Sequence, residues 1–166
     1  AAREAVKVYA YDEAMTAYGR ALECAEALER RGEQIDIEEA MGTTELMSGD
    51  LIGSIGHYER ALALAEDPAR RVGLQCQAAS AYVTTGNSRG LDYVREALAV
   101  LDPKTDPVTT AIAQSTEARF HHLSGRHRKA REILLSAVAL IEPSSDETPV
   151  STLHASTLST CYGYLA

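Results

Sequence analysis

The sequence contains no tryptophan and a single phenylalanine, and aromatic residues account for only 5% of its 166 positions. Alanine and leucine dominate instead, which is typical of slender helices that pack closely through small side chains, and nothing in the composition indicates a sheet. With 45% hydrophobic residues the chain is apolar enough to bury a core. We therefore expect an all-α fold.

Cysteine is also scarce, with Cys24, Cys76 and Cys161 far apart and without CxxC spacing. Each falls in a helical pattern, where a free thiol behaves as a small buried hydrophobe. No apolar run approaches the roughly 20 residues that span a bilayer, and the start lacks the layout of a signal peptide. These absences predict a reducing, cytoplasmic location and argue against a membrane partner.

Positive charge is in deficit, because 16 Lys and Arg face 24 Asp and Glu, which gives a net charge of −8. The average field of such a chain repels nucleic acids and anionic membranes. We therefore expect no nucleic-acid partner.

One short pattern recurs along the chain: a bulky residue, an alanine three positions later, and then an aliphatic residue. It occurs as Tyr18-x-x-Ala21-Leu22, Tyr58-x-x-Ala61-Leu62, Val94-x-x-Ala97-Leu98 and Leu134-x-x-Ala137-Val138. The alanine thus repeats at intervals of 40, 36 and 40 residues. Apolar residues at three- and four-residue steps around it predict helices, and repetition at this period indicates a helical repeat array.

Glycine and proline divide the chain into helical segments. The prolines, at positions 68, 103, 107, 143 and 149, all lie between expected helices. The expected helices span 11–30, 35–48, 51–67, 69–85, 88–101, 108–124, 126–142 and 150–166. Residues 1–10 resemble the end of another helix, and the repeat alignment favours a break before Tyr11 and an end at Arg31-Gly32. One unbroken helix over 1–30 is the alternative, since no glycine or proline separates the two parts.

Small residues occupy matching positions in these helices. In the first helix of a pair, a small residue precedes the turn glycine by seven positions, as in Gly42 and Gly49, Ala79 and Gly86, and Ala118 and Gly125. In the second helix, one small position holds Ala14, Ser54, Gly90 and Ala130, and another holds Ala21, Ala61, Ala97 and Ala137. Small side chains there let antiparallel helices approach to about 8 to 10 Å. This arrangement resembles the tetratricopeptide repeat (TPR) family.

The resemblance implies a right-handed α-solenoid of about four TPR-like helix pairs plus a leftover terminal helix. The whole of 1–166 would form a single domain, with repeats at approximately 1–32, 33–67, 68–104 and 105–143 and a partial fifth at 148–166. The repeats depart from the family in exceeding its usual length of about 34 residues and in lacking its tryptophan. Such long repeats are similar to arrays in bacterial signalling ATPases, nucleotide cyclases and transcriptional regulators, so we expect a fragment of a longer chain.

In TPR proteins the first helices line a concave groove that commonly binds a peptide or a partner's helix. The resemblance places in this groove Glu39, Thr43, Met47, Cys76, Gln77, Ser80, Thr84, Ser115, Arg119 and His122, with Arg3 and Lys7 as an extension. The groove is mixed and polar. Because its middle offers Arg119 as the main cation, the clamp with which some TPR proteins hold a terminal carboxylate is not favoured, and a solvated face without a ligand stays an alternative.

The main basic concentration lies near Gly125, with His121, His122 and His127 beside Arg126, Arg128 and Lys129. Adjacent histidines point about 100° apart on a helix and His127 follows the turn, so we expect no metal. A solvated turn is the simplest interpretation, and a docking point for an acidic partner is the alternative.

The sequence predicts no catalytic motif. Gly86-Asn87-Ser88-Arg89-Gly90 matches G-x-S-x-G, but a helix rather than a strand precedes it, so an inter-helix turn is predicted. The acidic pairs Asp12-Glu13 and Glu38-Glu39 are neighbours on helices, where side chains diverge, and are expected to be solvated. We expect neither an enzyme nor a cofactor.

The sequence thus predicts a protein–protein interaction scaffold whose groove binds a peptide or a helix. The alternative is a regulatory or self-association module of a larger bacterial signalling protein. Tyr162, Tyr164 and Leu165 near the end are expected to be exposed and to favour a homodimer through the terminal helices.

Overall fold

The computed structural model describes residues 2–141 and 163–164, with side chains from residue 10 onward. All regular structure in these residues is helical and no strand occurs among them, which confirms the all-α expectation. The helices are α1 (Ala2–Ala27), α2 (Arg31–Ser48), α3 (Leu51–Leu64), α4 (Pro68–Thr85), α5 (Arg89–Val100), α6 (Pro107–Leu123) and α7 (His127–Ile141). They form two compact units, Ala1–Thr85 and Gly86–Ala166, each of which is described by itself.

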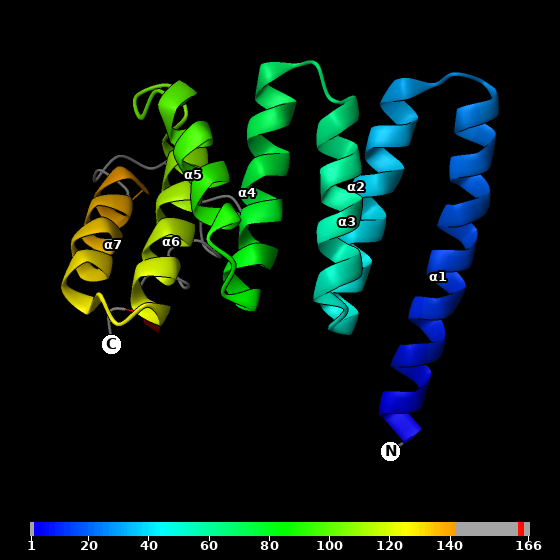
Figure 1. The fold of residues 1–166 in the computed structure, drawn as a ribbon, viewed down its shortest axis with the longest axis horizontal. Helices are drawn as coiled ribbons and strands as arrows, with labels where there is room; N and C mark the ends of the chain where they lie inside the picture. The colour runs from blue at the N-terminus through cyan, green and yellow to red at the C-terminus, as the bar shows by residue number, and fades with distance from the viewer. Residues whose placement is uncertain (1, 142–162, 165–166) are drawn as a thin grey trace, which may run out of the picture. The chain divides into compact units, whose positions relative to one another are not determined.

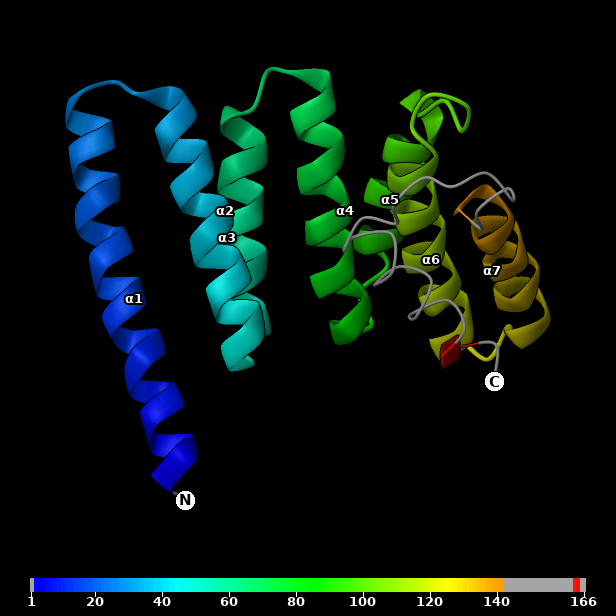
Figure 2. The same cartoon turned by 180° about the vertical axis from the view of Figure 1, so that it is seen from behind.

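In the first unit, α1 to α4 run up and down side by side (Figures 1 and 2). Each helix packs against the next one in the chain, and α2 and α3 share the most extensive contact. In the second unit, α5 packs against α6 and α6 packs more extensively against α7. Packing between consecutive helices is the arrangement that the repeat pattern predicts.

The beginning of the chain differs from the favoured prediction, because α1 is one unbroken helix with no interruption before Tyr11. It also ends at Ala27, earlier than the expected stop at Arg31-Gly32. Glu29 adopts a positive φ of 53° there, and the amide of Arg30 donates to the carbonyl of Ala25 at 2.9 Å. Glycine usually occupies this left-handed position at the end of a helix. Because a glutamate occupies it here, the sequence contains no marker of the helix end.

The turn between α2 and α3 lies where Gly49-Asp50 predicted it. Gly49 has a φ of 95°, and the Asp50 carboxylate accepts a hydrogen bond from the Gly53 amide at 3.0 Å. Pro68 begins α4 and Pro107 begins α6, as expected for residues that need no hydrogen-bond partner in the first turn. Gly86 and Gly125 have positive φ in the two predicted turns that follow α4 and α6.

Small residues at the α2–α3 joint bring the two helices together around Tyr58. Its ring is 1% exposed, and a Cβ added at Gly42 would lie 3.0 Å from Tyr58 Cε1. The Tyr58 hydroxyl is 3.1 Å from Thr43 Oγ1, so the polar end of the ring is hydrogen-bonded. Ala61 is fully buried one turn further along. The glycine therefore makes room for the aromatic side chain that fills the joint.

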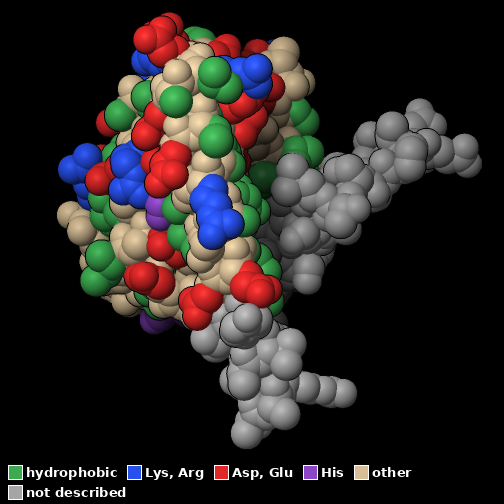
Figure 3. Space-filling view, turned by 90° about the vertical axis from the view of Figure 1, so that its right-hand side faces the viewer, with side chains coloured by type: hydrophobic (Ala, Val, Ile, Leu, Met, Phe, Trp, Pro, Cys, Tyr) green, Lys and Arg blue, Asp and Glu red, His purple; other side chains and the backbone are tan. Residues whose placement is uncertain are grey.

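The alanine position of the repeat is buried in three of its four occurrences. Ala61, Ala97 and Ala137 are 0% exposed, whereas Ala21 is exposed on α1. Cys24 is also exposed on α1, contrary to the expected burial, while Cys76 is buried and Cys161 lies outside the described residues. The reason is the missing break in α1: residues 2–10 continue the same helix, so they do not fold back over this side as a separate helix would. Figure 3 looks onto α1, where charged and small apolar side chains intersperse.

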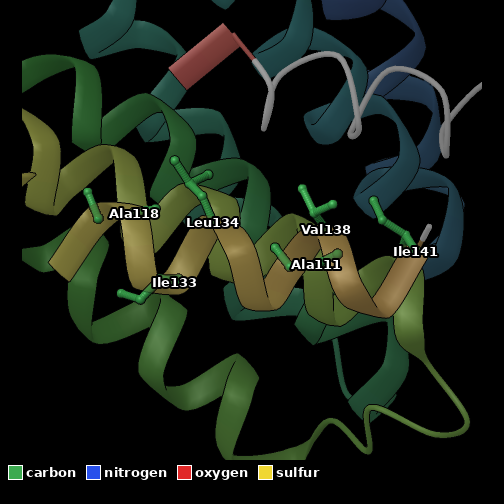
Figure 4. Packing of buried hydrophobic residues seen from close by; sticks show 8 residues of the cluster. Ala111, Ala118, Ile133, Leu134, Val138 and Ile141 are labelled. Carbon is green, nitrogen blue, oxygen red and sulfur yellow. The ribbon is translucent and has the colours of Figure 1, made fainter. Parts of the chain in front are cut away.

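The core of the second unit lies between α6 and α7. Alanines from α6 face larger aliphatic side chains from α7, and Figure 4 shows Ala111 and Ala118 beside Leu134, Val138 and Ile141. All five are buried. The small-against-large pattern is again what lets the two helices approach closely. The expected helix over 150–166 falls outside the described residues, apart from the helical residues 163 and 164.

Enlarging the repeat alanine should distinguish a packed position from an uncovered one. Ala61→Leu forces three additional carbon atoms into a filled joint and is expected to lower the free energy of unfolding by about 1 to 3 kcal/mol. Ala21→Leu, at the matching but exposed position, should change it by less than about 0.5 kcal/mol. Urea unfolding followed by circular dichroism measures both. Equal losses in the two variants would show that burial does not set the difference.

Candidate functional site

Six of the predicted groove residues lie in the first unit, on α2 and α4, and we call the surface they form the α2–α4 face. They are Glu39, Thr43, Met47, Gln77, Ser80 and Thr84. Glu39, Thr43 and Met47 follow one another at four-residue steps and so share one side of α2. Met47 is 69% exposed, and Thr43 and Thr84 are exposed as well. Part of the predicted groove is therefore an accessible surface.

Direct contacts join the two helices of this face. Gln77 Nε2 donates to Glu39 Oε1 at 2.6 Å, although the two residues are 38 positions apart in the chain. Arg70, at the start of α4, forms ion pairs with both Glu39 and Asp36 of α2. The helices α2 and α4 thus meet through Glu39 and Gln77, two side chains that the sequence assigned to one groove.

Three further residues of the predicted groove, Ser115, Arg119 and His122, lie on α6 in the second unit. Arg119 and His122 are half-buried there. Ser115 is buried, and its hydroxyl donates to the carbonyl of Ile112 at 2.8 Å. Cys76 of α4 is buried too, and burial raises the pKa of its thiol to about 11. Neither of these two side chains is available to a ligand. Arg3 and Lys7 lie outside the described side chains.

A buried polar cluster at the α2–α3 joint was not predicted. Glu38 is 4% exposed and His57 is 7% exposed. The His57 Nδ1–H donates to Glu38 Oε2 at 2.6 Å, and Arg60 Nε donates to Glu38 Oε1 at 2.9 Å. On the other side of the ring, His57 Nε2 lies 3.5 Å from Glu45 Oε2. One imidazole therefore lies between two carboxylates that are about two helix turns apart on α2.

This cluster corrects the interpretation of Glu38-Glu39 as a solvated pair. Adjacent helical residues do diverge, but the divergence points Glu38 into the joint while Glu39 reaches the α2–α4 face. The sequence held one usable signal, because Glu38 and Glu45 are seven residues apart on one side of the helix. Their partner His57 comes from α3, and no local pattern reveals that pairing.

The geometry of the cluster favours a structural role over a chemical one. The two carboxylates contact opposite nitrogens of the ring, so they share no point at which a metal could be bound by all three. Within the part of the chain that the structure describes, no group of three or more His, Cys, Asp or Glu is arranged to hold a metal. Ser88 lies in the turn before α5, as expected, and not at a nucleophile elbow.

Glu45 has a perturbed carboxyl group. Burial raises its pKa above the ordinary value of 4.5, while the nearby His57 opposes the rise. Glu45 Oε2 is buried and accepts no hydrogen bond from the described residues. Gly53 makes the position possible, because a Cβ there would lie 2.7 Å from Glu45 Cδ.

The basic segment around Gly125 is arranged differently from the prediction in one respect. His127 does follow the turn, yet the turn brings its ring back to α6, where His127 Nδ1 lies 3.3 Å from His122 Nδ1. The ring of Tyr164 lies 5.7 Å from that of His122. His121 points elsewhere: it is buried, and burial together with the charge of Arg126 lowers its pKa.

Comparison of the sequence with models of known protein families and with curated proteins finds no match. Among the described residues, no helix combines the length and the apolar character needed to cross a bilayer.

The raised pKa of Glu45 should make stability depend on pH. The folded state binds the proton of the Glu45 carboxyl group more tightly than the unfolded chain does. The resulting contribution to the free energy of unfolding is complete below pH 4.5 and is lost as the pH rises through the higher folded-state pKa. Glu45→Gln cannot ionise. The stability of the wild type relative to this variant is therefore expected to fall as the pH rises above about 4.5.

Urea unfolding at several pH values measures this difference. The matched control is Glu33→Gln, because Glu33 forms an exposed ion pair with Arg30 on the surface of α2. Parallel pH profiles for the wild type and Glu45→Gln would contradict the assignment.

Proposed function

We propose that this chain is a non-catalytic protein–protein interaction scaffold that binds a peptide or a helix of a partner along the α2–α4 face. The observation that carries the proposal is the contact between Glu39 and Gln77. It joins the first helices of two successive repeats into one continuous surface. TPR-like arrays bind extended segments on the surface that their first helices share.

The composition of the face supports a peptide rather than a small molecule. It carries an exposed methionine, the exposed residues Thr43 and Thr84, whose hydroxyls donate to carbonyls of their own helices, and a carboxylate already held by Arg70 and Gln77. Mixed polar and apolar groups along two neighbouring helices suit an extended backbone with alternating side chains. We include in the proposal the right-handed TPR-like solenoid and its four repeats, since the buried alanines at Ala61, Ala97 and Ala137 support the repeat register.

Blocking the face should abolish peptide binding without unfolding the chain. Peptides that bind the wild type are selected from a random displayed library. Their affinity for the wild type and for Thr43→Arg/Thr84→Arg is then measured by fluorescence anisotropy. The exposed positions accept the longer side chains, and binding is expected to weaken by at least about tenfold. The control Ala63→Arg/Ala99→Arg adds the same two charges at exposed positions on α3 and α5. Equal binding by both double variants would refute this face as the site.

A second candidate is a self-association module, and the uncovered side of α1 favours it. Ala21 is exposed although its counterparts in three other repeats are buried. A surface built to pack against a helix is available there for another copy of the chain.

Sedimentation velocity tests this second candidate. The wild type is expected to form a dimer at high protein concentration, and Ala21→Arg is expected to stay monomeric because the guanidinium cannot be buried without a partner. Ala63→Arg, an equally exposed alanine on α3, is the control and should dimerise like the wild type. A wild type that is monomeric at every concentration would exclude this candidate.

A further inference from the structure

Charge is distributed unevenly between the two units. Residues 1–85 contain fifteen Asp and Glu against eight Lys and Arg, a net charge of −7, and residues 86–166 contain nine against eight, a net charge of −1. Four cations of the second unit fall within six positions, at Arg126, Arg128, Lys129 and Arg131. Gly125 to Lys129 and Glu132 line an open cleft of about 360 Å³, which we call the basic turn.

The cations of the basic turn have no carboxylate partner among the described residues. In the first unit Arg30, Arg31, Arg60 and Arg70 each form an ion pair, whereas Arg20 and Arg71 form none with a described carboxylate. In the part of the chain that the structure describes, no carboxylate forms an ion pair with Arg126, Arg128 or Lys129. Arg126 instead lies over the ring of Phe120, 5.8 Å from its centre. The described residues of a net-negative chain thus include a cluster of positive charge without carboxylate partners.

The backbone adds to this positive field. The amide of Ala130 donates to the carbonyl of Arg126 at 3.0 Å, which marks Arg126 as the residue before the first turn of α7. In α3 and α4 an aspartate at this place accepts an amide hydrogen, from Gly53 and from Arg70 respectively. Arginine has no acceptor atom, and the first turn of α7 contains no acidic residue. The amide groups of that turn therefore point toward the same side as the cations.

The same positive charges affect the buried side chain of His121. Its ring is 7% exposed, its Nδ1 has no hydrogen-bond partner among the described residues, and burial, Arg126 and Lys129 all lower its pKa. The Glu117 carboxylate, 3.6 Å from His121 Nε2, opposes this lowering.

We propose that the basic turn is a second docking site, which binds a short acidic segment of a partner protein. Carboxylates are the groups that guanidinium forks and helix amides bind best together. The cluster covers a single turn and Glu132 borders it, so it fits a few carboxylates rather than a long polyanion. A duplex or a membrane would also meet the net charge of −8 carried by the whole chain. This site is separate from the α2–α4 face, and neither depends on the other.

The test uses a fluorescein-labelled twelve-residue peptide of glutamates spaced by glycine and serine, measured by anisotropy at about 50 mM salt. Arg126→Gln/Arg128→Gln/Lys129→Gln is expected to weaken its binding by at least about tenfold. The matched control Arg89→Gln/Arg95→Gln/Lys104→Gln removes three charges from the same unit and should weaken it by less than about twofold. The same peptide with glutamine for glutamate should not bind.

Several outcomes would overturn the proposal. One is that the wild type does not bind the acidic peptide at low salt. Another is that the two triple variants weaken peptide binding equally, because this would indicate non-specific attraction. Binding of single-stranded RNA or anionic vesicles at least as tight as that of the peptide, lost in the first triple variant, would assign another class of partner. A wild-type dimer that only the first triple variant abolishes would assign a second copy. Thermal unfolding of each variant checks that the fold is intact. Thr43→Arg/Thr84→Arg should bind the acidic peptide as the wild type does.

Discussion

Close approach of neighbouring helices is the constraint on which the other features depend. Gly42 leaves room for the Tyr58 ring, and Ala61 and Ala137 are fully buried where α3 and α7 meet their neighbours. A larger side chain at any of these places would push the backbones apart. Because the same small residues recur at nearly constant intervals, one local packing solution is used again along the chain.

The buried charged groups at the α2–α3 joint determine the register of the two helices more than they stabilise the fold. Taking Glu38 and His57 out of water costs free energy that their hydrogen bond only partly offsets. A shift of either helix by one residue would separate the 2.6 Å contact and disturb the paired Arg60–Glu38 and His57–Glu45 contacts, which would leave buried charge poorly compensated and cost more still. The cluster therefore penalises wrong registers, which apolar contacts between alanines alone would tolerate. This alignment also fixes Glu39 on the α2–α4 face, since it is the next residue on the same helix.

Most helices could be predicted from the sequence because their ends are marked by glycine, proline or aspartate, as at Gly49, Pro68 and Pro107. The failures lie where those markers are missing or are used differently. Glu29 closes α1 in a conformation that usually selects glycine, and Gly32 lies inside α2. The groove assignment on α2 and α4 rests on the resemblance to the TPR pattern, whereas the Glu38–His57 pair could not be predicted, because it joins two helices through side chains of ordinary composition.

Charge pairing separates the two proposed binding surfaces by the kind of partner each can recognise. On the α2–α4 face, Glu39 is already held by Arg70 and Gln77, so little free charge remains to attract a partner from a distance. Recognition there must come from shape, from hydroxyls and from apolar contact, and should change little with salt. At the basic turn the cations have no carboxylate partners among the described residues, so attraction acts beyond contact and weakens as salt screens it. The two proposed surfaces therefore recognise their partners by physically independent means, one by contact and the other by charge.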